Sequence, residues 1–267
     1  MRRITVRGIE LAYVERGAGT PLLLVHGYPL DHSMWNAQID TLADREGCRV
    51  IAPDLRGFGQ SEASRGVVTM EDMADDLAAL LDELGIDEPI VFCGLSMGGY
   101  VAFQFALKHA QRLAGLILCD TRAVADTPQL AAARRATAEE VLEEGSANLV
   151  AAMMPKLFAE LSASGSPQMV ESLGRVMLEN NPQGTAAAAL GMAQRPDVTA
   201  SLCKIDCPAL VIVGSQDAIS TAAEMRSIAD GIPGAEFVEI PNCGHMSPME
   251  KPDEVNAAIA RFIAALQ

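Results

Sequence analysis

The chain has few aromatic residues, few cations and no long apolar stretch. Aromatic residues make up 4% of its 267 residues, and 20 lysines and arginines stand against 35 aspartates and glutamates, a formal net charge of −15. This charge repels nucleic-acid phosphates and anionic lipid headgroups, so we expect neither nucleic acid nor a membrane as a partner. No apolar run approaches the roughly 20 residues that span a bilayer. Arg2 and Arg3 are followed by polar residues and not by the apolar segment of a signal peptide, so we expect a cytoplasmic protein.

Cysteines and histidines are also sparse, with 6 of the first and 4 of the second. Cys203 and Cys207 are close in sequence, but they lack the second cysteine pair or nearby histidines that a zinc site requires. Cys93 and Cys119 lie in apolar runs, where a free thiol behaves as a small apolar side chain. We therefore expect reduced structural thiols, no bound metal and no cofactor.

The hydrophobic residues, 49% of the chain, gather in short unbroken runs. Runs of this length suit the strands of a parallel sheet that is covered by helices on both faces. They occupy residues 22–25, 50–52, 90–93, 116–119 and 209–213. Apolar residues at three- and four-residue spacing predict helices between most of these runs, among them one from Thr69 to Gly85 and one that begins with Pro252. This alternation predicts an α/β fold with a mostly parallel, doubly wound sheet.

The strand pattern is absent between Arg122 and Ser201. Prolines divide this segment, which is rich in alanine, leucine and methionine, into short helical pieces; they stand at positions 128, 155, 167, 182 and 196. We interpret residues 123–200 as an inserted helical cap, and residues 1–122 together with 201–267 as the core domain. Met153 and Met177 are candidates for lining a substrate cavity, although methionine at helical spacing is more often ordinary core filling.

A Gly-x-Ser-x-Gly motif at residues 94–98 places Ser96 between the apolar run 90–93 and a helical stretch that starts near Tyr100. A strand, a sharp turn and a helix in this order are the context of a nucleophile elbow, whose strained turn projects a serine hydroxyl out of the sheet. Side chains at the two glycines would collide with the neighbouring strand and helix. The alternative is an ordinary glycine-rich turn at a helix start, because the motif alone also occurs by chance.

A serine nucleophile needs a base to take its proton and a carboxylate to orient that base. His245 is our candidate for the base, since it follows an expected strand at residues 236–240 and precedes the last helix. Asp217 follows the strand at residues 209–213, so serine, acid and base all stand just beyond the carboxyl ends of strands. Asp120 stands at another strand end and is an alternative acid.

Two backbone N–H groups are candidates for binding the negative oxygen that forms on an attacked carbonyl. The turn at residues 26–29 follows the run 22–25 and can direct the N–H of Tyr28 toward a substrate. Met97, directly after the serine and at the start of a helix, supplies the second N–H. We interpret His26 as a structural side chain that bonds to nearby loops.

These segments together resemble the α/β-hydrolase superfamily along essentially the whole chain. Beyond the motif at residues 94–98, the resemblance rests on the loop at residues 54–61 and on Gly244-His245 followed by residues 250–252. The chain order of serine, aspartate and histidine is also that of the family's catalytic triad. The resemblance implies an α/β-hydrolase fold with an inserted helical cap.

The resemblance further implies roles for single residues. By this likeness Ser96 is the nucleophile, Asp217 the acid, His245 the base and residues 26–29 the oxyanion loop. Residues 26–30 and 57–61 are similar to the cofactor-free haloperoxidase and perhydrolase branch, and the general pattern also fits enol-lactonases and carboxylesterases. A serine nucleophile excludes the haloalkane dehalogenases and epoxide hydrolases of the family, which form an ester on an aspartate.

The residues and the resemblance together predict a metal-free serine hydrolase. It is expected to cleave a small-molecule carboxylic ester or lactone through an acyl-enzyme on Ser96. Two alternatives stay open, because fold and triad do not fix the reaction class. One is a small-molecule receptor that hydrolyses its ligand slowly, and the other is a lyase or carbon–carbon hydrolase that uses the same triad.

Overall fold

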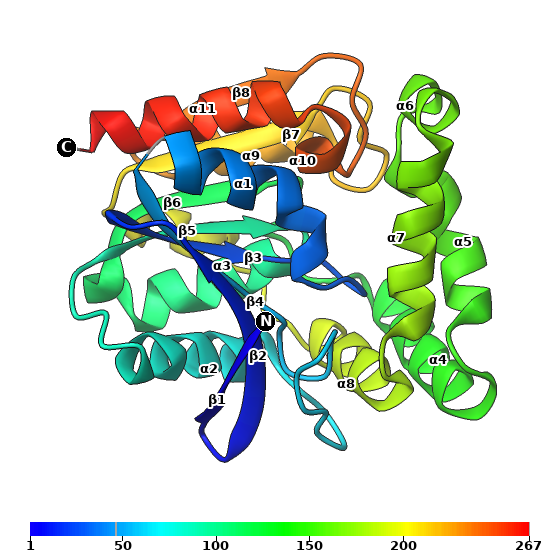
Figure 1. Ribbon diagram of the computed structural model, residues 1–267. Helices are drawn as coiled ribbons and strands as arrows, with labels where there is room; N and C mark the ends of the chain where they lie inside the picture. Colours follow the sequence, from blue (N-terminus) through cyan, green and yellow to red (C-terminus); the bar gives the residue numbers. More distant parts are fainter. Residues whose placement is uncertain (46, 267) are drawn as a thin grey trace.

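The structure is a computed structural model that describes residues 1–45 and 47–266. Within these residues, eight strands form one sheet in the order β1-β2-β4-β3-β5-β6-β7-β8 (Figure 1). The strands are β1 (Arg2–Val6), β2 (Ile9–Arg16), β3 (Thr20–Val25), β4 (Cys48–Pro53), β5 (Ile90–Leu95), β6 (Leu113–Cys119), β7 (Ala209–Gly214) and β8 (Glu236–Ile240). The pairs among β3 to β8 are parallel, whereas β2 pairs antiparallel with both β1 and β4. The mostly parallel sheet expected from the sequence is confirmed.

The first two strands were not expected from the sequence. β1 is largely exposed and contains no unbroken apolar run, whereas β2 contains one, at residues 11–14, that was not interpreted as a strand. They form a hairpin in which Val6 pairs with Ile9. The two residues of its turn, Arg7 and Gly8, both have positive φ, 47° and 81°, as a two-residue hairpin turn requires.

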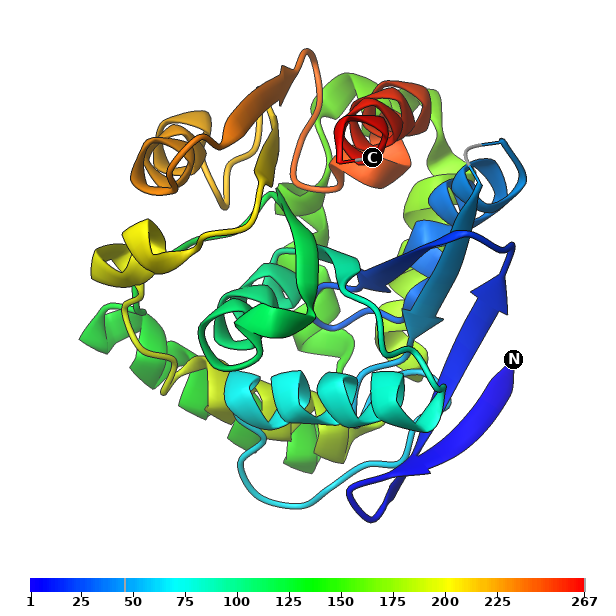
Figure 2. The same cartoon turned by 90° about the vertical axis from the view of Figure 1, so that its left-hand side faces the viewer.

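Helices cover both faces of the sheet (Figures 1 and 2). One face carries α1 (Asn36–Arg45) and α11 (Pro252–Ala265), and the other carries α2 (Met70–Glu83), α3 (Met97–Lys108) and α9 (Ala222–Gly231). Successive side chains of a strand point to opposite faces. In β3, Leu22 and Leu24 accordingly pack with α1 and α11, whereas Leu23 and Val25 pack with α2, α3 and α9. The sheet is therefore doubly wound, with a separate apolar core on each face.

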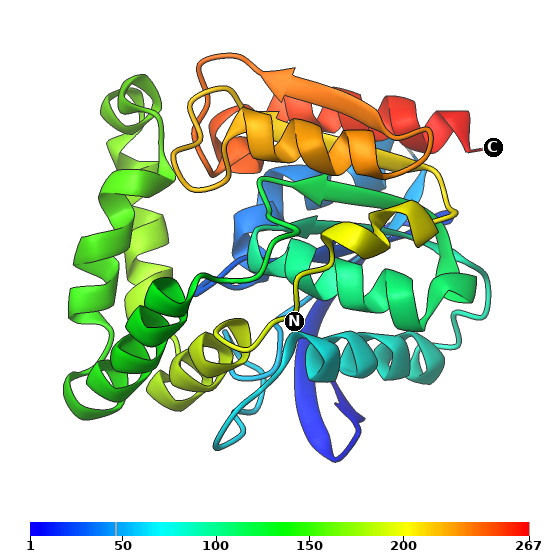
Figure 3. The ribbon, with the colours of Figure 1, turned by 180° about the vertical axis from the view of Figure 1, so that it is seen from behind.

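Within the described residues, five α-helices are inserted between β6 and β7 and lie at one end of the sheet (Figures 1 and 3). They are α4 (Pro128–Glu144), α5 (Ala147–Leu157), α6 (Glu160–Gly165), α7 (Pro167–Glu179) and α8 (Pro182–Met192). Three of them, α4, α7 and α8, begin with a proline. Proline has no backbone N–H, but an N–H in the first turn would have no partner within the helix, so no hydrogen bond is lost. Pro155 differs from expectation, because it lies inside the last turn of α5 and does not divide it. Because Pro155 lies so close to the end of the helix, its missing N–H removes only one helical hydrogen bond.

The two ends of the insertion lie beside each other. The N–H of Val198 donates to the carbonyl of Ala123 at 2.9 Å. The remaining helical elements are short: η1 (His32–Trp35), η2 (Ala110–Arg112), η3 (Thr199–Lys204) and α10 (Ser247–Glu250). Among the described residues, no helix is long and apolar enough to cross a membrane.

Candidate active site

Ser96 lies in the turn between β5 and α3 with φ of 53° and ψ of −110°, a strained backbone conformation for a residue with a side chain. The N–H of Ser96 donates to the carbonyl of Cys119 on the neighbouring strand at 2.9 Å. A Cβ atom at Gly94 would lie 2.3 Å from the Gly98 oxygen, and one at Gly98 would lie 2.3 Å from a backbone oxygen of β3. Only glycine fits at both positions, which is the physical reason for the motif. The strand, the strained turn and the helix form a nucleophile elbow.

A continuous chain of hydrogen bonds runs from Ser96 to a carboxylate. Nε2 of His245 lies 2.9 Å from Oγ of Ser96, and Nδ1 of the same ring lies 2.8 Å from Oδ2 of Asp217. The other carboxylate oxygen, Oδ1, accepts the backbone N–H groups of Ile219 (2.7 Å) and Ser220 (3.0 Å). Because both oxygens of Asp217 have donors, the carboxylate is fixed in the orientation that the imidazole needs.

These three side chains come from the carboxyl ends of β5, β7 and β8, where the sequence places them. His245 and Asp217 are 3% and 6% exposed, so their contact is shielded from water. A carboxylate on Nδ1 leaves Nε2 as the proton acceptor of the ring and stabilises the imidazolium form. The arrangement can therefore remove the proton of the Ser96 hydroxyl.

The two candidate oxyanion donors lie on elements that meet at the elbow. A Cβ atom at Gly27 would lie 3.4 Å from the Cβ of Ser96, so the turn after β3 packs directly against the serine. The hydrogen bond that closes this turn is donated by the N–H of Leu30 to the carbonyl of Gly27, at 3.0 Å. The turn is therefore closed without the N–H of Tyr28. Met97 is the first residue of α3, and N–H groups in the first turn of a helix have no partner inside it.

His26 stays outside this chain of hydrogen bonds, as expected of a structural side chain. Its Nε2 accepts the N–H of Leu55 at 2.9 Å, and its Nδ1 lies 2.8 Å from the carbonyl of Gly27, to which it donates. Burial lowers the pKa of His26, so the ring is neutral at pH 7. The ring connects the turn after β3 to the loop after β4.

Asp120, the alternative acid, has other partners. It lies completely buried at the end of β6, with φ of 46°. Its Oδ1 accepts the N–H of Gly214 at 2.8 Å. Burial, together with the nearby charge of Asp217, raises the pKa of Asp120 well above that of an ordinary aspartate. The carboxylate that forms the hydrogen bond with Nδ1 of His245 belongs to Asp217 and not to Asp120.

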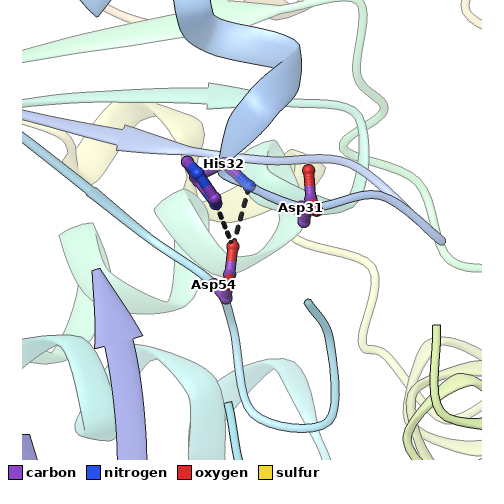
Figure 4. A group of neighbouring side chains, drawn as sticks. All are labelled: Asp31, His32 and Asp54. Atoms are coloured by element: carbon purple, nitrogen blue, oxygen red, sulfur yellow. Dashed lines mark hydrogen bonds and ion pairs between the residues drawn. The ribbon is translucent and has the colours of Figure 1, made fainter. Parts of the chain in front are cut away.

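Asp31, His32 and Asp54 form a second polar group beside the turn after β3 (Figure 4). Among the described residues, this group could offer a metal three ligand atoms, all within 4.8 Å of one another. Asp54, however, already accepts from the backbone and ring of His32 at 2.9 and 2.6 Å and from the N–H of Gln60 at 2.8 Å, and Asp31 accepts from the N–H of Ser33. Burial opposes a charge on His32, but the hydrogen bond with Asp54 and the negative charges of Asp54 and Asp31 together raise the pKa of His32. We therefore assign this group the role of fixing the turn and assign it no metal.

The two candidate cavity residues lie on different inserted helices. Met153, on α5, is partly buried and contacts both apolar cores, whereas Met177, on α7, is completely buried. Their contact with a substrate stays a prediction.

Two residues to which the sequence assigns no role bind the loops of the site. Nδ2 of Asn180, at the end of α7, donates to the carbonyl of Pro29 at 2.8 Å, and its Oδ1 accepts the N–H of Gly59 at 2.7 Å. Glu250 accepts N–H groups from the loop of His245 and from the inserted helices. Glu250 could have been found from the sequence, because it belongs to the segment 250–252 on which the family resemblance partly rests. No sequence pattern points to Asn180.

Comparisons with known proteins agree with this geometry. The family model of the alpha/beta hydrolase fold matches residues 20–252. The chain is 30% identical to 3-oxoadipate enol-lactonase 2 of Acinetobacter baylyi, across 96% of this chain and 94% of that protein. The solved structure of a thermophilic esterase from Thermogutta terrifontis, with malate bound, shares 49% identity and superposes with a TM-score of 0.97, covering 100% of this chain and 99% of that one. For the enol-lactonase from Burkholderia xenovorans LB400 the identity is 31% and the TM-score 0.92, covering 98% of this chain and 100% of that one. The chain therefore belongs to the α/β-hydrolase fold family.

Proposed function

We propose that this protein is a serine hydrolase that cleaves small-molecule carboxylic esters or lactones. The observation that carries the proposal is the chain of hydrogen bonds from Asp217 through His245 to Ser96, with distances of 2.8 and 2.9 Å. The substrate class is supported by the similar proteins, among them an esterase and two enol-lactonases. The nucleophile is activated by a histidine, so no step needs a metal or a cofactor.

The reaction begins when Oγ of Ser96 attacks the carbonyl carbon and its proton passes to Nε2 of His245. Asp217 stabilises the imidazolium that results. The N–H groups of Tyr28 and Met97 hold the negative oxygen, and each such donor is worth a few kcal/mol of barrier. The bond to the alcohol oxygen breaks as Nε2 returns the proton to it, which leaves an acyl ester on the serine. Water then attacks this ester with the same proton transfers, and the acid is released.

We further propose that residues 123–200 act as a cap over the strand ends and select the acyl group, while residues 1–122 and 201–267 carry the chemistry. The inserted helices lie at one end of the sheet (Figure 3). In this proposal Met153 and Met177 line the acyl site. Flexible thioether side chains adapt to aliphatic chains, and the chain has 13 methionines but a single tryptophan.

The test is pre-steady-state hydrolysis of p-nitrophenyl acetate. We expect a burst of nitrophenol close to one equivalent and an acetyl mass increase on the tryptic peptide of Ser96. Ser96→Ala should lose turnover by roughly 10³-fold or more, while Ser227→Ala, an exposed serine on α9, should behave as wild type. Ligand binding without turnover would instead indicate a receptor. Turnover of a carbon–carbon or elimination substrate with no acyl adduct would indicate a lyase or carbon–carbon hydrolase.

A further inference from the structure

The side chain of Glu250 connects the loop that carries His245 to the inserted helices. Its Oε1 accepts the N–H of Gly244 at 2.9 Å, and its Oε2 accepts the N–H of Ala159 at 3.0 Å. Gly244 directly precedes His245, and Ala159 lies in the connection between α5 and α6. One carboxylate therefore holds two backbone segments that are far apart in sequence.

The other neighbour of His245 is attached to the same connection. The N–H of Met246 donates to the carbonyl of Leu157 at 3.1 Å. A Cβ atom at Gly244 would lie 2.5 Å from the backbone nitrogen of Ala159, so the two segments are also in direct contact. The residues before and after His245 are thus both fixed to residues 157–159.

We propose that Glu250 is a positioning residue that couples the connection between α5 and α6 to His245, so that a displacement of these helices moves the imidazole relative to Ser96. The inference rests on the proposed function, because it matters only if His245 is the base. Proton transfer requires Nε2 within hydrogen-bond reach of Oγ, and it is 2.9 Å away here. A misplacement of about 1 Å can cost roughly 10²-fold in rate.

Glu250→Gln is the sharpest single change. The amide keeps the size of the side chain but replaces one accepting oxygen with an NH₂ group, which cannot accept an N–H. We expect kcat for p-nitrophenyl acetate to fall roughly 10-fold or more, because the base moves. KM should change less than about twofold, because the loosened residues 157–159 include neither Met153 nor Met177 of the proposed acyl site. Glu254→Gln is the matched control, since Glu254 is exposed in the first turn of α11, whereas Glu250 ends α10, and it should equal wild type.

A variant on the other side of the contact tests the coupling itself. Ala159 has φ of −63° and follows a residue in extended conformation, so the backbone there permits proline. Proline removes the N–H that Glu250 accepts and puts its Cδ atom in the place of that hydrogen, which displaces the carboxylate. Ala159→Pro should reproduce part of the loss in kcat. If the two residues act through one contact, the double variant should lose less than the product of the two single losses.

Amide hydrogen exchange supplies a second measurement. In Glu250→Gln, peptides covering residues 157–159 and 243–246 should exchange faster together, with the remaining protein unchanged. Glu250 borders a surface hollow of about 410 Å³ between α6 and the loop after β8, so the substitution leaves no buried void and the variant is expected to fold. Wild-type kcat in Glu250→Gln, or faster exchange with kcat unchanged, would overturn the proposal. Failure of the proposed function is a separate result, namely no burst and no acyl adduct in the wild-type protein.

Discussion

Oδ2 of Asp120 is hydrogen-bonded to the hydroxyl of Ser247, two residues after His245. The same carboxyl group binds the N–H of Gly214 through Oδ1, three residues before Asp217. Asp120 therefore connects the loop of the acid to the loop of the base, although it contacts neither Nδ1 nor Nε2 in the chain of hydrogen bonds described above. Two carboxyl groups at neighbouring strand ends thus have different functions in our proposal: Asp217 orients the imidazole, and Asp120 holds the loops.

Asparagine substitutions separate the two carboxyl groups. Asp217→Asn should lower kcat by roughly 10⁴-fold, because an amide facing Nδ1 favours the wrong imidazole tautomer. Asp120→Asn should cost far less, because its oxygen still accepts from Gly214 and its NH₂ group donates to Ser247. Both kcat values are measured on variants with wild-type thermal unfolding. A larger loss in Asp120→Asn would exchange the two assignments.

The raised pKa of Asp120 gives a pH-dependent stability with a definite sign. Burial and the charge of Asp217 raise this pKa above the 3.8 of an ordinary aspartate. From about pH 4 upward to the raised pKa, the native protein keeps a proton that the unfolded chain has released, so the contribution of Asp120 to stability falls as pH rises. Asparagine has no proton to lose. The unfolding free energy of Asp120→Asn, relative to wild type, should therefore increase by up to about 1.4 kcal/mol per pH unit within this window.

Urea unfolding of both proteins at intervals from pH 5 to pH 8 measures this difference. All other titrating groups are common to the two proteins and cancel to first order. A difference that stays constant with pH would show that Asp120 is ionised in the native protein.

The fold was predictable wherever the signal is local. The strands from β3 to β7 contain short apolar runs, and α2 begins near the expected position with a capping box, in which Thr69 and Asp72 each accept the N–H of the other at 3.0 Å. β1 has no such mark, because it lies at the sheet edge and is largely exposed. β2 contains one short apolar run, at residues 11–14 between two glutamates, and this run was not recognised as a strand.

The positions of the candidate residues were predictable, and the contacts that support them were not. Ser96, Asp217 and His245 follow strands in a recognisable order, so the sheet topology brings them together. The hydrogen bond between Asp120 and Ser247 joins residues 127 positions apart, and the one between Ala159 and Glu250 joins residues 91 positions apart. No periodicity or motif links such pairs, because they depend on how separate loops pack.

The glycines of the elbow give a stability prediction. In Gly94→Ala the new methyl group would lie 2.3 Å from the backbone oxygen of Gly98, and a backbone atom inside a packed sheet cannot move away cheaply. We expect a loss of at least ~2 kcal/mol of unfolding free energy. Gly165→Ala is the control, because a methyl group there would meet no atom of another segment within 4 Å, and its change should stay within about 0.5 kcal/mol. Chemical unfolding at pH 7 measures both, and equal stabilities would contradict the packing argument.

Substitutions of Met153 and Met177 should shift the preferred acyl-chain length in opposite directions. Met153 is partly buried, so Met153→Trp should shorten the preferred acyl chain by filling space. Met177 is completely buried, so Met177→Ala should favour longer chains by opening space, at a cost of about 2–5 kcal/mol of stability. The measurement is kcat/KM for p-nitrophenyl esters from acetate to decanoate. An unchanged profile in both variants would show that these methionines only fill the core.

The hydrogen bond between Val198 and Ala123 has a consequence for how such enzymes diversify. Because the five inserted helices begin and end beside each other at Ala123 and Val198, a link of a few residues could replace them, while residues 199–208 still cross to the start of β7. The connection between β6 and β7 can therefore vary greatly in length and sequence at a small entropic cost to the closed loop, while the register of the sheet and the order of its strands stay the same. Substrate range and chemistry can then change independently within one fold.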